Sequence, residues 1–289
     1  MIAVDWGTSS FRAFRVRDGQ VLARRETPHG ILHVGSDEFA PTLRRVVGPW
    51  LEAGETQILM AGMVGSRQGW LEVPYLPCPA GVGELAAALT AVPFEGAAVR
   101  IVPGLRSVDA NGVPEVMRGE ETQIAALLPT LDLAIACLPG SHSKWVEIAE
   151  ERITGFTTHM TGEAFAALRQ HTILARTMAE GETHTDAFRR GVVRSAEQGG
   201  LLHHLFGVRT QALFGELPET EAASYLSGLL VGHEVVAMAP VGKVHLIGTP
   251  ALCSLYALAI SYYGAEPVVA PADAAALGLI EIAERAKWT

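Results

Sequence analysis

A group of residues suited to binding phosphate lies near the start of the chain. It combines a carboxylate, a glycine, hydroxyl side chains and an arginine: Asp5, Gly7, Thr8, Ser9, Ser10 and Arg12. Glycine lets a backbone approach a ligand closely, and the hydroxyl and N–H groups of such a turn bind phosphate oxygens. A carboxylate is a hard oxygen ligand that suits hydrated Mg²⁺. The stretch predicts a phosphate-binding turn beside a metal-binding acid, although an ordinary hairpin with a polar turn has the same composition.

A second stretch, residues 135–146, repeats the pattern of the first. Without gaps, Ile2 aligns with Ile135 and Gly7 with Gly140, so that Ser141 and Ser143 take the hydroxyl positions. Both copies continue into an expected hairpin. Two such turns indicate an internal duplication and an enzyme that binds a nucleotide with both copies. Asp5 aligns with Leu138, so only the first copy has the carboxylate.

A glycine-rich loop follows the apolar run 57–61, which predicts a buried strand. The loop contains Gly65, Ser66, Arg67 and Trp70. In open α/β sheets, ligands bind beyond the carboxyl ends of strands. Arg67 is suited to a bidentate contact with a carboxylate, and Trp70 to packing on a carbon chain. The loop is therefore a candidate substrate site, and the alternative is that Arg67 is an ordinary surface arginine.

Two further segments carry candidate site residues. Glu120 and Glu121 begin an expected helix, where they either complement the helix dipole or face a ligand, binding Mg²⁺ or accepting a proton. Gly248, Thr249 and Pro250 lie between an expected strand and an expected helix. Such a turn at a helix N-terminus is suited to a nucleotide's phosphates or adenosine, although many α/β units share it.

Composition excludes several classes of protein. The chain has 289 residues, 49% of them hydrophobic and 18% charged, which is typical of a globular protein with room for two domains. A net charge of −9 argues against general binding to nucleic acid or a membrane surface. Cys78, Cys137 and Cys253 have no metal-binding spacing and indicate buried thiols in a reducing cytoplasm. The most apolar run, 246–263, is too polar for a membrane span, and no signal peptide is expected.

The candidate site residues must be positioned by the strands and helices around them. Strand and helix patterns alternate along the chain, and this alternation predicts an α/β fold. Beyond the two hairpins we expect helices over 39–51, 83–92, 120–128, 161–176, 185–198, 221–239, 251–263 and from 271, with strands over 57–61, 98–102, 133–138 and 243–247 and a last short strand that ends at 268–269. Ser36 or Asp37 is the expected N-cap of the first helix. His203 and His204 lack a convincing ligand spacing, so a structural role is expected for them.

The motifs together resemble the superfamily of sugar kinases, heat-shock-70 proteins and actin. More narrowly, the chain is similar to the 2-dehydro-3-deoxygalactonokinase family. The stretches that carry the narrower resemblance are 5–13, 65–70, 117–123, 138–145, 247–252 and 271–276, of which 65–70 and 138–145 are the specific ones. The resemblance implies two duplicated ribonuclease-H-like (actin-like ATPase) domains, with mixed sheets flanked by helices and an interdomain cleft.

The resemblance also implies an activity and a division of the chain. The activity is ATP-dependent phosphorylation of the terminal 6-hydroxyl of 2-dehydro-3-deoxy-D-galactonate, in galactonate breakdown. Residues 1–131 would bind substrate and residues 132–272 the nucleotide, with the final helix, 273–289, packing back on the first domain. The expected partners are the sugar acid and Mg²⁺-ATP, and a homodimer is left open. The alternatives are a kinase for another sugar or sugar acid, or an ATP-dependent switch.

The family pattern assigns roles to the candidate residues. Asp5 would hold Mg²⁺ through water, with Glu120 as a further metal ligand. The two turns would bind the β- and γ-phosphates, and Arg12 or Lys144 would neutralise charge that develops in the transition state. Arg67, helped by Gly65, Ser66 and Trp70, would bind the substrate carboxylate, and adenosine would lie near residues 248–250. The general base is left open between His142, Glu120 and Glu121, because the second turn contains no carboxylate.

Overall fold

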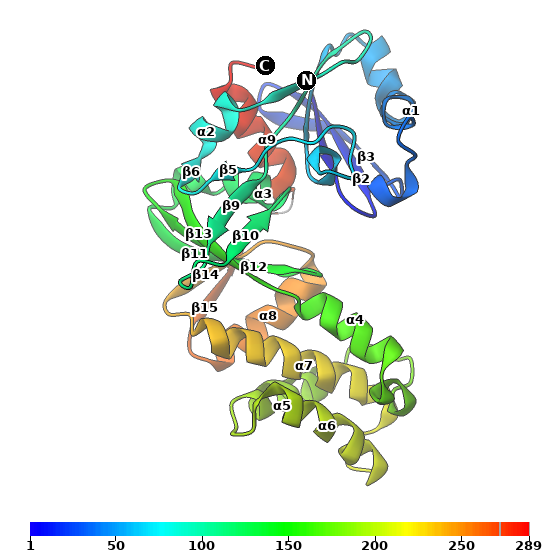
Figure 1. Ribbon diagram of the computed structural model, residues 1–289, viewed down its shortest axis with the longest axis vertical. Coiled ribbons are helices and arrows are strands. Elements are labelled where there is room, and N and C mark those ends of the chain that lie inside the picture. Colours follow the sequence, from blue (N-terminus) through cyan, green and yellow to red (C-terminus); the bar gives the residue numbers. More distant parts are fainter. Residues whose placement is uncertain (272, 289) are drawn as a thin grey trace. The chain divides into compact units, whose positions relative to one another are not determined.

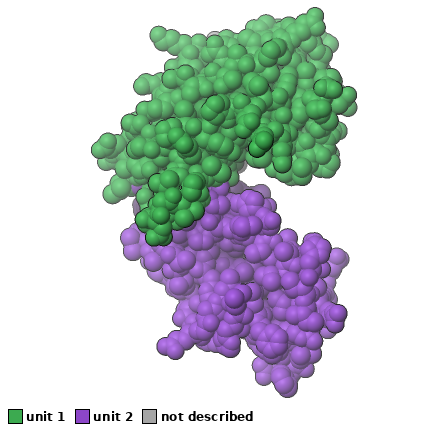
Figure 2. Space-filling model, viewed as in Figure 1, with its two compact units in different colours: residues 1–133, 147–156, 271–289 green, residues 134–146, 157–270 purple. Residues whose placement is uncertain are grey.

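The computed structural model describes residues 1–271 and 273–288 (Figure 1). The chain forms two compact units, which are coloured separately in Figure 2. Unit 1 comprises Met1–Leu133, Glu147–Phe156 and Pro271–Thr289, and unit 2 comprises Ala134–Val146 and Thr157–Ala270. Within the described residues, no helix combines the length and apolarity needed to cross a membrane.

A six-stranded sheet forms the centre of unit 1, in the order β3-β2-β1-β4-β8-β7. The strands are β1 (Ile2–Trp6), β2 (Phe11–Arg17), β3 (Gln20–Thr27), β4 (Gln57–Ala61), β7 (Thr90–Val92) and β8 (Ala98–Ile101). β1 runs antiparallel to β2 and parallel to β4, and β4 runs parallel to β8. All five residues of β1 are buried, as a continuous apolar run at the centre of a sheet predicts.

Helices α1 (Phe39–Glu52) and α9 (Ala274–Arg285) pack on this sheet. Phe39, Leu43, Val47 and Trp50 form the buried stripe of α1, and their helical spacing joins them to the core around β1. The predicted N-cap is wrong, because Glu38 occupies that position without a side-chain hydrogen bond. Pro41 lies in the first turn and has no N–H to offer a capping side chain.

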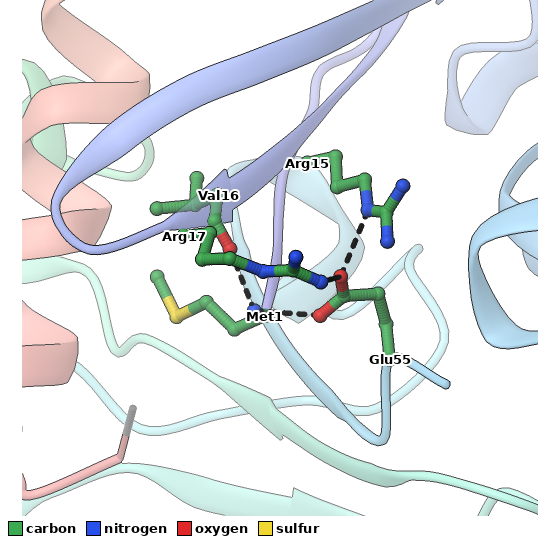
Figure 3. Close-up of polar contacts among 5 residues, drawn as sticks. All are labelled: Met1, Arg15, Val16, Arg17 and Glu55. Atoms are coloured by element: carbon green, nitrogen blue, oxygen red, sulfur yellow. Dashed lines mark hydrogen bonds and ion pairs between the residues drawn. The ribbon is translucent and has the colours of Figure 1, made fainter. Parts of the chain in front are cut away.

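The start of β1 is held by the carboxylate of Glu55 (Figure 3). Glu55 accepts hydrogen bonds from the Met1 ammonium at 2.9 Å and from Arg15 Nε at 2.8 Å, and Arg17 lies 3.5 Å away. Burial alone would raise the pKa of Glu55, but the bonds from the ammonium and Arg15 outweigh it and lower that pKa. The charged carboxylate therefore ties the start of β1 and strand β2 to the loop between α1 and β4.

The segment between β4 and α3 differs most from the sequence predictions. The helix expected over 83–92 is shorter, because α2 (Val82–Ala87) ends and β7 follows, pairing antiparallel with β8. An unexpected three-stranded sheet also forms, from β5 (Leu76–Pro77), β9 (Leu105–Val108) and β10 (Pro114–Met117). Its hairpin closes because the Asp109 carboxylate accepts the N–H groups of Asn111 and Val113. Helix α3 (Glu120–Ala125) then ends three residues before the predicted position.

The second six-stranded sheet has the order β15-β14-β11-β12-β13-β6. Its strands are β6 (Ala80–Gly81), β11 (Leu133–Leu138), β12 (Ser143–Ala149), β13 (Arg152–His159), β14 (Lys243–Leu246) and β15 (Glu266–Val269). β11, β14 and β15 are parallel to one another. Cys137, Val244 and Leu246 from these strands pack with Phe188 and Tyr256 from helices in the core of unit 2.

Five helices belong to unit 2: α4 (Thr161–His171), α5 (Thr185–Ser195), α6 (Gly200–Leu213), α7 (Glu219–Met238) and α8 (Pro250–Tyr262). The single helix predicted over 161–176 is divided, because Thr172 interrupts it and accepts the N–H of Leu174. The predicted structural role of His204 agrees with its full burial, where Nδ1 lies 3.0 Å from Nε2 of His233.

Candidate active site

The first turn, residues 7–10, joins β1 to β2 and is fixed by backbone bonds. Gly7 N–H donates to Ser10 O at 2.9 Å, and the N–H groups of Ile31 and Leu32 donate to Gly7 O and Thr8 O. Thr8 and Ser9 are exposed. The hydroxyls expected to bind phosphate are therefore accessible on a turn that other backbone segments hold in place.

Asp5 lies beside this turn, on the last part of β1. It pairs across the sheet with Arg12 of β2, and the two side chains form an ion pair. Burial raises the pKa of Asp5 despite the opposing effect of Arg12. Gly62 passes next to this carboxylate, since a Cβ on Gly62 would lie 3.3 Å from Asp5 Oδ1 and 2.7 Å from Trp6 O.

Glu121 is fully buried at the start of α3. Its Oε2 accepts the N–H of Gly119 at 2.6 Å, and its Oε1 has no partner among the described residues. Burial, and then the charge of Glu120, raise the pKa of Glu121 to about 8. A Cβ on Gly119 would lie 3.1 Å from the Cα of Gly62, which itself passes close to Asp5, so the residue before α3 packs beside the part of β4's loop that borders Asp5. A carboxyl group that titrates near neutral pH is suited to proton transfer.

The carboxylates near the first turn suit Mg²⁺ in their chemistry. In the described part of the chain, no group of three or more His, Cys, Asp and Glu side chains is arranged to hold a metal. Mg²⁺ in phosphoryl-transfer enzymes needs only one or two carboxylates, with phosphate and water as the other ligands. Asp5 meets this requirement, whereas Glu120 accepts the N–H of Arg118 at 2.9 Å.

The predicted substrate loop follows β4 and includes a short 3-10 helix, Met63–Gly65. Arg67 is exposed. Trp70 is partly buried in the core of unit 1, stacked on Phe39 and edge-on to Phe94. Ser66 is buried, and its Oγ has no partner among the described residues. The loop thus presents Arg67 outward while Trp70 anchors it.

Arg118 supports this loop, and the sequence patterns did not single it out. Its Nη2 donates to Val73 O at 2.6 Å, and its guanidinium lies 4.2 Å from the ring centre of Tyr75. A Cβ on Gly65 would lie 2.9 Å from Arg118 Nη1, so the glycine leaves room for the guanidinium. The signal in the sequence is an arginine between Met117 and Gly119, directly before the two glutamates of the same motif.

The second turn, residues 140–143, lies in unit 2 with its residues facing different ways. Ser141 and His142 are exposed, and His142 pairs with Glu163 on α4. The Ser143 hydroxyl is fully buried, 2.8 Å from the hydroxyl of Tyr256. Lys144 is also buried, and its Nζ donates to Thr158 Oγ1 at 2.9 Å. The side chains of Ser143 and Lys144 therefore point to the interior, in contrast to the ligand-facing roles expected for them.

The predicted adenosine segment lies next to the second turn. Ile247 N–H donates to Cys137 O at 3.0 Å, and a Cβ on Gly248 would lie 3.5 Å from Pro139 O. Gly248, Thr249 and Pro250 are exposed, and Pro250 is the first residue of α8. The two segments expected to bind nucleotide are thus brought together within unit 2.

A cavity of about 240 Å³ opens beside them. It lies among α4, α5, α7 and α8 and the loop before α5, and Gly140 of the second turn borders it. Its lining combines apolar side chains, such as Phe165 and Leu255, with polar ones, such as Arg169, Glu182 and Ser227. Apolar walls with a few polar groups are typical of small-molecule sites.

The fold and these turns define an actin-like ATPase and sugar-kinase architecture. The N-acetylglucosamine kinase structure from Porphyromonas gingivalis has the same fold, with a TM-score of 0.51, 16% identity and 98% of each chain covered. A family model described as 2-keto-3-deoxy-galactonokinase matches residues 5–282. The chain belongs to this family and is therefore a carbohydrate kinase, a class that uses ATP.

Relatives over the full length agree with the family. The probable 2-dehydro-3-deoxygalactonokinase DgoK1 of Rhizobium meliloti (strain 1021) is 38% identical, covering 99% of this chain and 97% of that protein. The 2-dehydro-3-deoxygalactonokinase of Escherichia coli (strain K12) is 34% identical, covering 95% and 94%. A crystal structure from Sinorhizobium meliloti, described as a 2-dehydro-3-deoxygalactonokinase protein, has a TM-score of 0.90 with 37% identity and 99% of each chain covered.

Proposed function

We propose that the protein transfers the γ-phosphate of ATP to the 6-hydroxyl of 2-dehydro-3-deoxy-D-galactonate in galactonate breakdown, giving the 6-phosphate and ADP. The observation that carries the proposal is the full-length similarity to proteins named 2-dehydro-3-deoxygalactonokinase. We further propose that it acts in the cytoplasm with Mg²⁺. Residues 1–131 would bind the sugar acid and residues 132–272 the nucleotide, with the final helix, 273–289, belonging to the first domain. Residues 272 and 289 lie outside the described residues.

Nucleotide binding in unit 2 is supported by the second turn, the Gly248 turn and the cavity beside Gly140. We assign the base and ribose to the cavity and the phosphates to the exposed part of the second turn. Backbone N–H groups can bind phosphate oxygens without side-chain hydroxyls, so this assignment is compatible with the buried hydroxyl of Ser143.

Sugar-acid binding in unit 1 is supported by Arg67, an exposed guanidinium on a loop that Trp70 and Arg118 anchor. A guanidinium binds a carboxylate through two parallel hydrogen bonds, and an anchored loop keeps that fork in place. A neutral sugar would give Arg67 no such partner. The loop therefore favours an acidic substrate over a neutral one.

Phosphoryl transfer depends on positioning and on neutralising charge. Asp5 would hold Mg²⁺ through water, and the metal would supply positive charge to the phosphate oxygens. Arg12 is a better candidate than the buried Lys144 for neutralising the negative charge that develops in the transition state, because the side chain of Arg12 is 42% exposed. We assign proton acceptance to the deprotonated form of Glu121, because burial and the Glu120 charge raise its pKa to about 8 and so make its carboxylate a stronger base, which becomes more abundant as the pH rises. His142 is the rival, already paired with Glu163.

An assay of ADP release tests the reaction. Mg²⁺-ATP would be combined with 2-dehydro-3-deoxygalactonate, with its gluconate epimer and with a panel of neutral sugars. Turnover that depends on the keto acid supports the proposal. A preference for a neutral sugar would replace the substrate, and ATP hydrolysis that ignores every sugar would favour a switch.

The Arg67→Ala variant tests the carboxylate contact. A lost charge-assisted pair contributes about 1.5–3 kcal/mol, so KM for the keto acid is expected to rise about tenfold or more, with kcat much less affected. Arg106→Ala is the matched control, because Arg106 is another exposed arginine of unit 1. An unchanged KM in the Arg67 variant would remove this residue from the substrate site.

A further inference from the structure

A buried carboxylate in unit 2 accepts hydrogen bonds from four side chains that lie on three different elements. Glu234 of α7 is only 3% exposed. Its Oε1 accepts from Trp145 Nε1 at 2.7 Å, and its Oε2 accepts from Tyr256 at 2.8 Å, from Ser143 at 3.1 Å and from Thr161. These donors belong to β12, α4 and α8, so one carboxylate connects three elements to α7.

The environment of Glu234 is unusual for a carboxylate. No cation in the described part of the chain forms an ion pair with it, and its neighbours Val231 and Val235 belong to an apolar core. Burying a charge without a counter-ion is costly unless hydrogen bonds replace its hydration. An apolar side chain at this position would fill the core at lower cost, so packing alone does not explain a glutamate here.

Three of the four donors belong to the candidate nucleotide site. Ser143 is the last residue of the second turn, which is assigned to the phosphates. Thr161 and Tyr256 line the cavity that is assigned to the nucleoside. Ser143 and Tyr256 also contact each other directly, with 2.8 Å between their hydroxyl oxygens. The network therefore joins the phosphate-binding turn to two walls of the cavity.

We propose that Glu234 is a positioning residue for the nucleotide, which holds the second turn and the cavity walls in one fixed arrangement through Ser143, Thr161 and Tyr256. The inference rests on the proposed nucleotide site and goes beyond it, because Glu234 does not itself line the cavity and is not one of the exposed residues of the second turn. The preorganised arrangement reduces the ordering that ATP must otherwise impose when it binds.

All four side chains donate to Glu234, so this position requires a group that only accepts hydrogen bonds. A carboxylate only accepts, and its two oxygens can satisfy four donors. Glutamine has one accepting oxygen and an amide that must donate, so at least one hydroxyl donor or the Trp145 N–H loses its acceptor. Burial, with the adjacent Glu234 charge, raises the pKa of Tyr256, so its hydroxyl stays a neutral donor.

The test compares ATP and sugar-acid binding in the Glu234→Gln variant of the full chain. Calorimetric titration with Mg²⁺-ATP is expected to show at least tenfold weaker affinity, and KM for ATP should rise in parallel. KM for the sugar acid should change less than twofold, since the network lies in unit 2 alone. Glu221→Gln is the control, because Glu221 is on the same helix and contacts His184 and Arg190 instead.

Several outcomes would contradict the positioning role of Glu234. ATP affinity within twofold of the wild type, or equal changes in both KM values, would overturn the positioning role. If Glu234→Gln does not fold, Tyr256→Phe and Ser143→Ala each remove one donor, and each is expected to weaken ATP at least threefold. Unchanged ATP affinity in both would also overturn it. A wild-type protein that binds ATP but phosphorylates no sugar acid contradicts the proposed function alone.

Discussion

At the scale of single residues, three buried carboxylates of unit 1 differ in what compensates their burial. Glu55 has the Met1 ammonium and Arg15, and its pKa falls. Asp5 has Arg12 alone, and burial prevails, so its pKa rises. Glu121 has backbone N–H groups and, more weakly, the Arg118 charge, but burial and the Glu120 charge prevail, so its pKa rises to about 8. Of these three carboxylates, Asp5 and Glu121 are thus the ones that bind protons more strongly than usual.

The raised pKa of Glu121 predicts a pH dependence of stability. The folded state keeps the proton up to about pH 8, whereas the unfolded chain releases it near pH 4.5. The free energy of unfolding therefore falls as pH rises through this window. The expected loss is on the order of a few kcal/mol. Glu121→Gln stays neutral, so its advantage over the wild type should grow from pH 5 to pH 8.

Urea unfolding at several pH values measures this difference. Glu52→Gln, on the exposed side of α1, is the control, and its curve should run parallel to that of the wild type. Parallel curves for Glu121→Gln and the wild type would show that the pKa of Glu121 is not raised in the folded protein, and would remove the raised basicity on which its assignment as the proton acceptor rests.

At the scale of elements, α5 and α7 pack unusually closely because glycines lie between them. A Cβ on Gly228 would lie 1.9 Å from Phe188 O, and a Cβ on Gly191 would lie 2.2 Å from Tyr225 O. Glycine costs helix stability, but here it lets two backbones meet. This contact holds the helix that carries Glu234 and therefore supports the cavity.

Gly228→Ala is expected to destabilise the protein by about 3 kcal/mol, because the added methyl group forces α5 and α7 apart. Gly207→Ala on α6 is the matched control. The nearest atom to its added Cβ would be Gln211 Nε2 at 3.7 Å, so the higher helix propensity of alanine should leave stability unchanged or raise it by up to about 1 kcal/mol. Denaturant unfolding compares the two, and similar losses in both would contradict the close-packing argument.

At the scale of the whole molecule, each of the two units has its own apolar core. Separate cores allow each ligand to stabilise the unit that binds it. The proposed division therefore predicts that the two substrates protect different parts of the chain from hydrogen exchange.

Hydrogen exchange read out by mass spectrometry tests this division. A non-hydrolysable ATP analogue alone should slow exchange mainly in residues 134–146 and 157–270. The sugar acid alone should slow exchange mainly in residues 1–133, and galactose, a neutral sugar, should do neither at the same concentration. Protection by the ATP analogue that is confined to residues 1–133 would reverse the assignment of the units.

The sequence by itself determined the family, the fold class and most of the regular elements. The apolar runs at β1, β4 and β11 and the turns after them are local patterns, and local patterns largely decide where a strand ends and a turn begins. The same patterns predicted turns at Gly140 and Gly248. The helix predicted over 83–92 was wrong in its second half, because strand pairing of β7 with β8 outweighed helical propensity there.

Only the tertiary structure decided which way each polar side chain faces and what compensates its burial. Ser143 and Lys144 are neighbours in sequence and both are buried, which no alternating strand pattern predicts. The supporting contacts of Arg118 and Glu234 also depend on tertiary structure, because their partners, such as Val73 for Arg118 and Tyr256 for Glu234, are distant in the sequence. The physical reason is that burial, and therefore pKa and hydrogen bonding, depends on which distant segments pack together, whereas a turn depends on its own residues.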